Sequence, residues 1–224
     1  MSGGSIELGQ RPVLSVGIAT ADPLALGGEL DVLDAAGIRV VHVDVMDGVF
    51  CPVVSTAGPS LARALRARFV VDVHLMVERP LEQVPVWVAA GAQMVTFHAE
   101  ATRHSLRVLQ STDPSETVRG VALLPSTPLA TLGPLLDHVE LVQLLAVSPG
   151  WSGQRFLANT LERIREAREL IGDRRVLLAV DGGVNREVVP SLVDAGVDVV
   201  VCGSAIFDGG DAGRNARDIL ALMR

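Results

Sequence analysis

The chain is poor in the residues that build disulfide frameworks, thiolate metal sites and aromatic binding surfaces. It has two cysteines, Cys51 and Cys202, which are far apart and form no CxxC pattern, so neither a disulfide scaffold nor a thiolate zinc site is predicted. Tyrosine is absent and aromatic residues make up 3% of the chain, which leaves few rings for stacking on bases. Acidic residues outnumber basic ones, 26 to 19, which disfavours general binding to nucleic acid.

Long apolar runs are missing as well. No run reaches the ~18 residues that a membrane-spanning helix needs, and residues 1–12 are polar and glycine-rich. We therefore predict a cytoplasmic protein without membrane contact, in a reducing compartment, with a flexible N-terminal tail over residues 1–12. Residues 13–224 are enough for a single domain that buries its own core.

Short runs rich in Val, Ile and Leu alternate with amphipathic stretches along the whole chain. The runs predict strands at 13–18, 39–46, 69–76, 93–98, 118–123, 140–147, 175–181 and 197–203. The stretches predict helices at 23–36, 57–67, 80–90, 127–137, 159–171 and 185–195. Alternation with helices favours parallel strands, and eight units without a linker predict an α/β fold, a (β/α)₈ TIM barrel. A doubly wound open sheet is the alternative.

Polar side chains stand at the ends of three predicted strands, where barrels carry their chemistry. The two-residue period puts polar residues and methionine on one strand face, as His42, Asp44 and Met46 and as Asp72, His74 and Met76. Asp181 ends a third strand. Four of these side chains suit one divalent ion, with Zn²⁺ or Fe²⁺ favoured and Mn²⁺ or Co²⁺ as alternatives: His42, Asp44, His74 and Asp181.

Other ionisable residues receive lesser roles. Asp72 lies deeper in its strand, so we expect it to orient a ligand histidine. His98 is a further candidate for such a supporting role, whereas His104 and His138 are expected on the surface. The two methionines, Met46 and Met76, would lie next to the metal, where their adaptable apolar side chains could cover a planar reaction intermediate and exclude water. Plain core packing is the alternative.

Glycine-rich segments follow three late strands. They are Ser148–Gln154 (SPGWSGQ), Asp181–Gly183 (DGG) and Gly203–Ser204 (GS). Glycine lets backbone N–H groups approach a phosphate closely, and barrels often bind phosphate in the loops after strands seven and eight. The segments together predict a phosphate site, although each glycine alone is equally compatible with a tight turn.

The motifs HVDVMDG, DVHLMV, GVALLPSTPL, VSPGWSGQRF, VDGGVN and CGSAIF resemble the ribulose-phosphate 3-epimerase family, in the family's order across residues 14–207. The resemblance implies a barrel of the ribulose-phosphate-binding type and a divalent ion on His42, Asp44, His74 and Asp181. It also implies that Asp44 and Asp181 act as acid and base. Contacts to substrate and its phosphate would map to His74, Gly150, Trp151, Ser152, Gly153, Gly182, Gly183, Gly203 and Ser204.

Departures from the family pattern gather where the sugar is expected. Gly17 stands where the family usually has a serine hydroxyl, and Ser15 would compensate only if the strand shifted. Leu124, Leu145 and Ser148 also differ from the usual residues. We therefore expect the sequence to specify the type of reaction more firmly than the identity of the sugar.

The predicted function is the interconversion of D-ribulose 5-phosphate and D-xylulose 5-phosphate, by two-carboxylate proton transfer through an enediolate. One alternative is a 3-epimerase of another phosphoketose, such as a hexulose 6-phosphate. A second is a non-catalytic sugar-phosphate-binding homologue, and a third is a metal-independent barrel lyase or isomerase. The expected partners are a phosphorylated ketose and further copies of the chain in a homo-oligomer.

Overall fold

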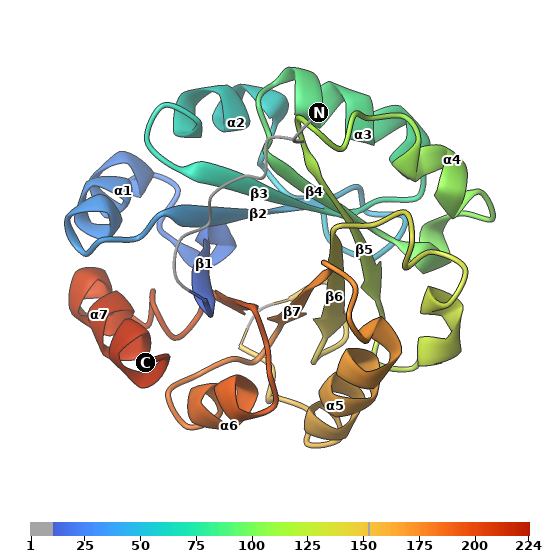
Figure 1. Cartoon of the computed structure of the whole chain (residues 1–224). Helices are drawn as coiled ribbons and strands as arrows, with labels where there is room; N and C mark the ends of the chain where they lie inside the picture. Colours follow the sequence, from blue (N-terminus) through green and yellow to red (C-terminus); the bar gives the residue numbers. More distant parts are fainter. Residues whose placement is uncertain (1–10, 152) are drawn as a thin grey trace.

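Eight parallel strands form a closed barrel in a computed structural model that describes residues 11–151 and 153–224 (Figure 1). Each strand pairs with the next in the sequence, and the first strand pairs with the last. This closure confirms the predicted barrel and rules out the open sheet. The strands are β1 (Val13–Gly17), β2 (Val40–Met46), β3 (Val70–Met76), β4 (Met94–His98), β5 (Val118–Leu123), β6 (Leu141–Leu145), β7 (Leu177–Asp181) and β8 (Val199–Cys202).

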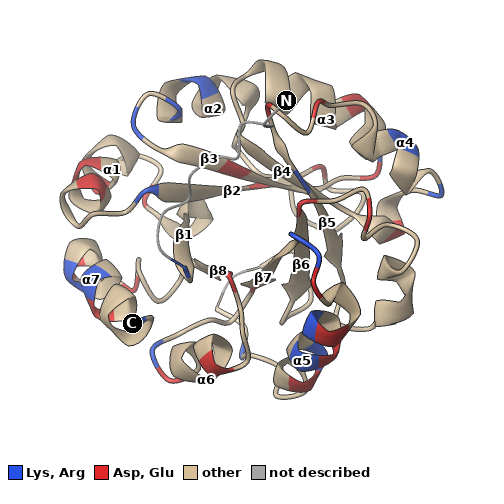
Figure 2. Ribbon diagram, in the orientation of Figure 1, with Lys and Arg blue, Asp and Glu red and all other residues tan. Residues whose placement is uncertain are grey.

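Helices surround the barrel on the outside (Figure 1). They are α1 (Leu26–Ala35), α2 (Pro59–Leu65), α3 (Pro80–Ala89), α4 (Ser105–Leu109), α5 (Thr160–Ile171), α6 (Val189–Asp194) and α7 (Ala212–Leu222), with 3₁₀ helices η1 (Ile18–Thr20), η2 (Ala99–Ala101) and η3 (Leu129–Leu132). Charged residues lie mainly on this outer layer, and both signs occur on α5 and α7 (Figure 2). None of the helices in the described part of the chain is long and apolar enough to cross a bilayer.

The helix predicted at 127–137 is wrong. Only the short η3 forms there, because Pro134 has no N–H to donate to a carbonyl one turn earlier. Two helices, α4 and α7, were not predicted from the sequence. The second of them carries a recognisable start signal, since the side chain of Asp211 accepts a hydrogen bond from the Arg214 backbone N–H.

The interior of the barrel changes from apolar to polar along the strands. At the amino ends the interior holds an aliphatic cluster that includes Val13, Val40, Met94, Leu141, Leu177 and Val199. Nearer the carboxyl ends, the buried polar side chains include Ser15, His42, Asp72, His74, Thr96, His98 and Gln143. Parallel register pairs His42 with Asp72 and Asp44 with His74, so neighbouring strands bring these residues together at one level.

Candidate active site

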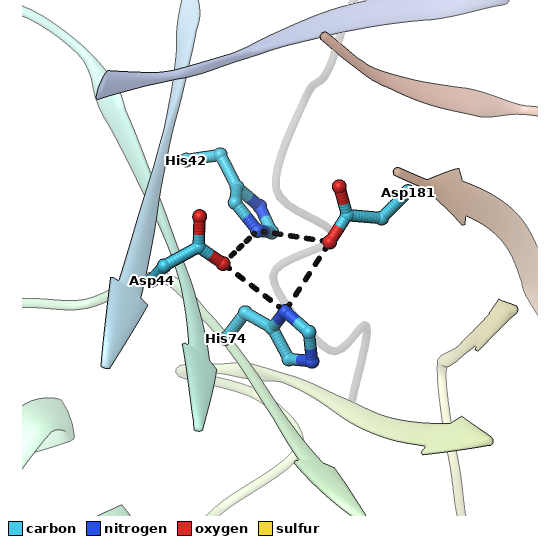
Figure 3. Close-up of side chains that lie close together, drawn as sticks. All are labelled: His42, Asp44, His74 and Asp181. Atoms are coloured by element: carbon cyan, nitrogen blue, oxygen red, sulfur yellow. Dashed lines mark hydrogen bonds and ion pairs between the residues drawn. The ribbon is translucent and has the colours of Figure 1, made fainter. Parts of the chain in front are cut away.

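Four side chains converge at the carboxyl end of the barrel, from β2, β3 and β7 (Figure 3). Each offers one ligand atom, and these atoms all lie within 4.8 Å of one another: His42, Asp44, His74 and Asp181. The Asp44 Oδ1 atom is 3.3 Å from both His42 Nε2 and His74 Nδ1. The Asp181 Oδ2 atom is 3.3 Å from His74 Nδ1 and 3.8 Å from His42 Nε2. The sequence pattern predicted that these four would meet, and they do.

The His42 ring is held from behind by a buried carboxylate. Its Nδ1 lies 2.8 Å from Asp72 Oδ2, which also accepts a hydrogen bond of 2.9 Å from the Ser15 hydroxyl. Its Nε2 points into the cluster and forms ion-pair contacts with Asp44 and Asp181, but no described residue makes a hydrogen bond of good geometry with it. A buried nitrogen left in this state is the arrangement that a bound cation would satisfy.

The His74 ring has a different support. Its Nε2 lies 2.9 Å from His98 Nε2, and His98 Nδ1 lies 3.3 Å from Glu100 Oε2. Both imidazoles are fully buried. His98 therefore stands directly behind a residue of the cluster, as the sequence suggested, whereas His104 and His138 are exposed.

Burial and opposite charges compete in this cluster. Burial lowers the pKa of His42, but the nearby carboxylates of Asp72 and Asp44 outweigh it and raise the pKa well above its ordinary value. The pKa of His74 is raised in the same way by Asp181 and Asp44, against burial. Burial would raise the pKa of Asp44, yet the two imidazoles lower it below its usual range. In the metal-free protein, protons thus occupy positions that a divalent ion would take over.

The two carboxylates reach a cavity, while the two imidazoles lie beneath its floor. The side chains of Asp44 and Asp181 are 20% and 19% exposed, and those of His42 and His74 are fully buried. The cavity has a volume of about 490 Å³. Its lining includes most of the remaining sequence-predicted site residues: Met46, Met76, Gly150, Trp151, Gly153, Gly182, Gly183, Gly203 and Ser204. The predicted contact at Ser152 lies outside the described residues.

The departures from the family pattern divide into two groups. Gly17, Leu145 and Ser148 line the cavity, whereas Leu124 is not among its lining residues. The suggestion that Ser15 compensates for Gly17 is wrong, because its hydroxyl is fully buried and donates to Asp72. Gly17 itself has room for a side chain, since a Cβ there would make ordinary contact at 3.5 Å with Gly203 Cα.

Several glycines of the late loops have a backbone that other residues rarely adopt. Gly150, Gly153, Gly182 and Gly183 all have positive φ angles, between 67° and 122°. At Gly183 a Cβ would also come within 2.6 Å of the Phe156 backbone nitrogen. The loop after β6 is braced by Gln154, whose side-chain amide donates to the carbonyls of Ser148 and Trp151 at 2.6 and 2.9 Å.

Replacing Gly183 with alanine is expected to lower the free energy of unfolding by about 1–3 kcal/mol, because the new Cβ meets backbone atoms at an unfavourable φ. Urea denaturation measures this change. The control is Gly27→Ala in α1, where nothing lies within 4 Å and alanine favours the helix. Equal stability of the two variants would contradict the prediction.

Two supporting residues were not found from the sequence, Glu100 and Gln143, and Gln154 was included only as the last residue of the glycine-rich segment Ser148–Gln154. Gln143 donates to Asp181 Oδ2 at 3.3 Å from an inward position of β6. Its signal was available, since Gln143 is the only polar residue in the run LVQLL. Glu100 lies just after β4, and no pattern in the sequence indicates that it faces His98.

A closed parallel barrel with a four-residue ligand cluster and glycine-rich loops at its carboxyl end defines a (β/α)₈ barrel enzyme site. The model of the ribulose-phosphate 3 epimerase family matches residues 13–207. The chain therefore belongs to the ribulose-phosphate 3-epimerase family and is an isomerase of the carbohydrate-phosphate epimerase class.

Curated relatives agree with this assignment. The chain is 38% identical over 199 residues to the ribulose-phosphate 3-epimerase of Bacillus subtilis, covering 87% of this chain and 91% of the relative. It is 40% identical over 200 residues to that of Treponema pallidum, with 88% and 91% covered. The Escherichia coli K12 protein of the same name is 39% identical over 201 residues, with 88% and 89% covered.

Solved structures show the same fold at lower identity. The 3-hexulose-6-phosphate synthase of Salmonella typhimurium superposes with a TM-score of 0.73 at 17% identity, covering 96% of this chain and 98% of that chain. The Mycobacterium tuberculosis tryptophan synthase gives 0.72 at 15% identity, with 96% and 93% covered. At such identities the likeness concerns the barrel alone.

Proposed function

We propose that the chain is a metal-dependent 3-epimerase that interconverts D-ribulose 5-phosphate and D-xylulose 5-phosphate. The observation that carries the proposal is the cluster of His42, Asp44, His74 and Asp181, whose two carboxylates open into a glycine-lined cavity. Membership of the family supports the reaction type. Cytoplasmic location and assembly as a homo-oligomer remain predictions.

The donor set fits one divalent ion. Two imidazole nitrogens and two carboxylate oxygens suit Zn²⁺ or Fe²⁺, and also Mn²⁺ or Co²⁺. The unpartnered Nε2 of His42 supports this use, because its ring is already fixed by Asp72. When bound, the ion would polarise the substrate carbonyl and stabilise the negative charge of the enediolate.

Inversion at carbon 3 needs one group that removes a proton and another that returns one from the opposite face. Asp44 stands on β2 and Asp181 on β7, so the two carboxylates approach the cavity from different sides of the barrel. We propose that either one removes the carbon 3 proton while the other donates, according to the direction of reaction. Met46 and Met76 would cover the planar intermediate and exclude water.

The phosphate would be held by backbone rather than by basic side chains. All 19 basic residues other than histidine are arginines, and none of them lines the cavity. We propose that backbone N–H groups at Gly150, Gly153, Gly182, Gly183 and Gly203 bind the phosphate, with Trp151 and Ser204 beside them. The contact expected at Ser152 stays a prediction. A direct contact of His74 with the substrate stays a prediction, because its side chain is fully buried and is not among the residues that line the cavity.

A second candidate function is 3-epimerisation of another phosphoketose, such as a hexulose 6-phosphate. The altered cavity residues Gly17, Leu145 and Ser148 favour it, because they change the lining without touching the ligand cluster. A metal-independent lyase would leave the ligand cluster without a function. A lyase mechanism that forms an imine with the substrate would need a lysine, and the sequence contains none. A purely binding role leaves the paired carboxylates unexplained.

The test is a panel of phosphorylated ketoses incubated with the protein in deuterated water, with deuterium uptake at carbon 3 followed by NMR. We expect the fastest uptake with D-ribulose 5-phosphate and D-xylulose 5-phosphate, accompanied by interconversion of the two. Faster uptake with a hexulose 6-phosphate would favour the second candidate. A panel without any uptake would contradict both and support a binding protein.

A further inference from the structure

The support of His74 extends beyond the ligand cluster through two further side chains, the buried His98 and the partly exposed Glu100. From His74 Nε2 it passes at 2.9 Å to His98 Nε2, and from His98 Nδ1 at 3.3 Å to Glu100 Oε2. This chain of contacts thus leads from β3 through β4 to η2, away from the cavity.

The direction of the hydrogen bonds follows from what each group can donate. An ionised carboxylate only accepts, so the Nδ1–H of His98 donates to Glu100. In a neutral imidazole the other nitrogen is then an acceptor, so the Nε2–H of His74 donates to His98. The Nδ1 of His74, which faces Asp44 and Asp181, is then the nitrogen that would give up its proton and bind an ion.

Glu100 is itself anchored through its second oxygen. Its Oε1 accepts a hydrogen bond of 2.8 Å from the Leu124 backbone N–H and another from the Thr127 hydroxyl. The carbonyl of Thr127 in turn accepts from Arg163 of α5 at 2.9 Å. Both oxygens of this carboxylate are therefore used as acceptors, one toward His98 and one toward the loop after β5.

We propose that His98 and Glu100 are positioning residues that fix the tautomer and the ring orientation of His74 and thereby raise its affinity for a divalent ion. The inference rests on the metal-dependent function proposed above. It gives the two histidines of the cluster different supports. His42 contacts a carboxylate, Asp72, directly, whereas His74 reaches the carboxylate of Glu100 only through the imidazole of His98.

Glu100→Gln tests the proposal with little change in shape. An amide has a single acceptor oxygen, so this variant must present an NH₂ group either to His98 or to the loop. If the NH₂ faces His98, the preferred tautomers of His98 and His74 are both reversed. If it faces the loop, it meets the Leu124 N–H, and the anchor of the chain is lost.

The measurement is the dissociation constant for Zn²⁺, by competition with a chromophoric chelator, together with ¹⁵N NMR of the imidazoles. Glu100→Gln is expected to weaken Zn²⁺ binding about 10- to 100-fold and to change the nitrogen shifts of His74. The matched control is Glu166→Gln on the exposed face of α5, which should bind like wild type. Unchanged affinity and unchanged His74 shifts in Glu100→Gln would overturn the proposal.

A second pair of variants decides the matter if Glu100→Gln does not fold. In His98→Gln the side-chain amide can still accept from His74 and donate to Glu100, whereas His98→Leu can do neither. We expect His98→Leu to lose about 10- to 100-fold in Zn²⁺ affinity and His98→Gln to lose less. Equal affinities would contradict the positioning role.

Failure of the proposed function gives a different result. If the wild-type protein binds no Zn²⁺, Fe²⁺, Mn²⁺ or Co²⁺, the metal-dependent function is wrong. The ¹⁵N shifts of His74 in the metal-free protein still report whether Glu100 sets its hydrogen bonding.

Discussion

Asparagine in place of Asp44 or Asp181 is expected to slow interconversion of the two epimers by about 10²- to 10⁴-fold in each variant. Inversion needs a proton acceptor on one face of carbon 3 and a donor on the other, and an amide serves as neither. Because each carboxylate is also a member of the ligand cluster, the substitution removes a negatively charged ligand atom as well.

The two effects can be separated by measuring metal content beside epimerisation and deuterium uptake. A variant that keeps its ion, takes up deuterium from one epimer and does not interconvert the pair would have lost one proton-transferring group. The matched control is Asp173→Asn, an exposed carboxylate that precedes β7 at the opposite end of the strand from Asp181. Full epimerisation in either active-site variant would rule out the two-carboxylate mechanism.

Removal of the ion by a chelator is expected to abolish activity, and addition of one equivalent of Zn²⁺ or Fe²⁺ to restore it. The expected loss follows because the ion would supply the positive charge that stabilises the enediolate in this site. Stability should also fall, because a ligand present at about 1,000 times its dissociation constant stabilises the folded state by about 4 kcal/mol.

Elemental analysis of the purified protein, followed by calorimetry with and without the ion, checks both parts of this prediction. His42→Gln serves as a comparison, since it lacks the imidazole whose Nε2 is otherwise unpartnered. Its unfolding temperature should respond less to added Zn²⁺ than that of wild type. Full activity after complete removal of divalent ions would falsify the metal-dependent reading and favour the metal-independent alternative.

The barrel and the ligand cluster could be predicted from the sequence because both depend on short-range periodicity. In a parallel sheet the two-residue alternation of β2 and β3 determines which side chains share a face, and the register then sets Asp44 beside His74. Asp181 could be predicted as a member of the cluster from its position alone, because it ends an apolar run. The observed strand bounds differ from the predicted ones by no more than two residues at either end.

What could not be predicted depends on contacts between loops and on single backbone atoms. Glu100 meets His98 and the loop after β5 only because the 3₁₀ turn after β4 directs it there. The hydrogen bond from the Ser15 hydroxyl to Asp72 could not be predicted, because it joins two strands. The expectation that Ser15 would replace the missing hydroxyl at Gly17 had considered only the strand that holds both residues. The helix expected at 127–137 was suggested by apolar spacing, but Pro134 interrupts it.

The distribution of the cluster along the chain has a consequence for folding. Three of its residues come from the adjacent strands β2 and β3, while Asp181 comes from β7, more than a hundred residues later. The first three can assemble within one half-barrel, but the fourth joins them only when the second half has docked. A cation held by all four would connect β2 and β3 to β7, so we expect loss of the ion to weaken the contact between these parts of the barrel, in addition to the closure that the β1–β8 pairing already provides.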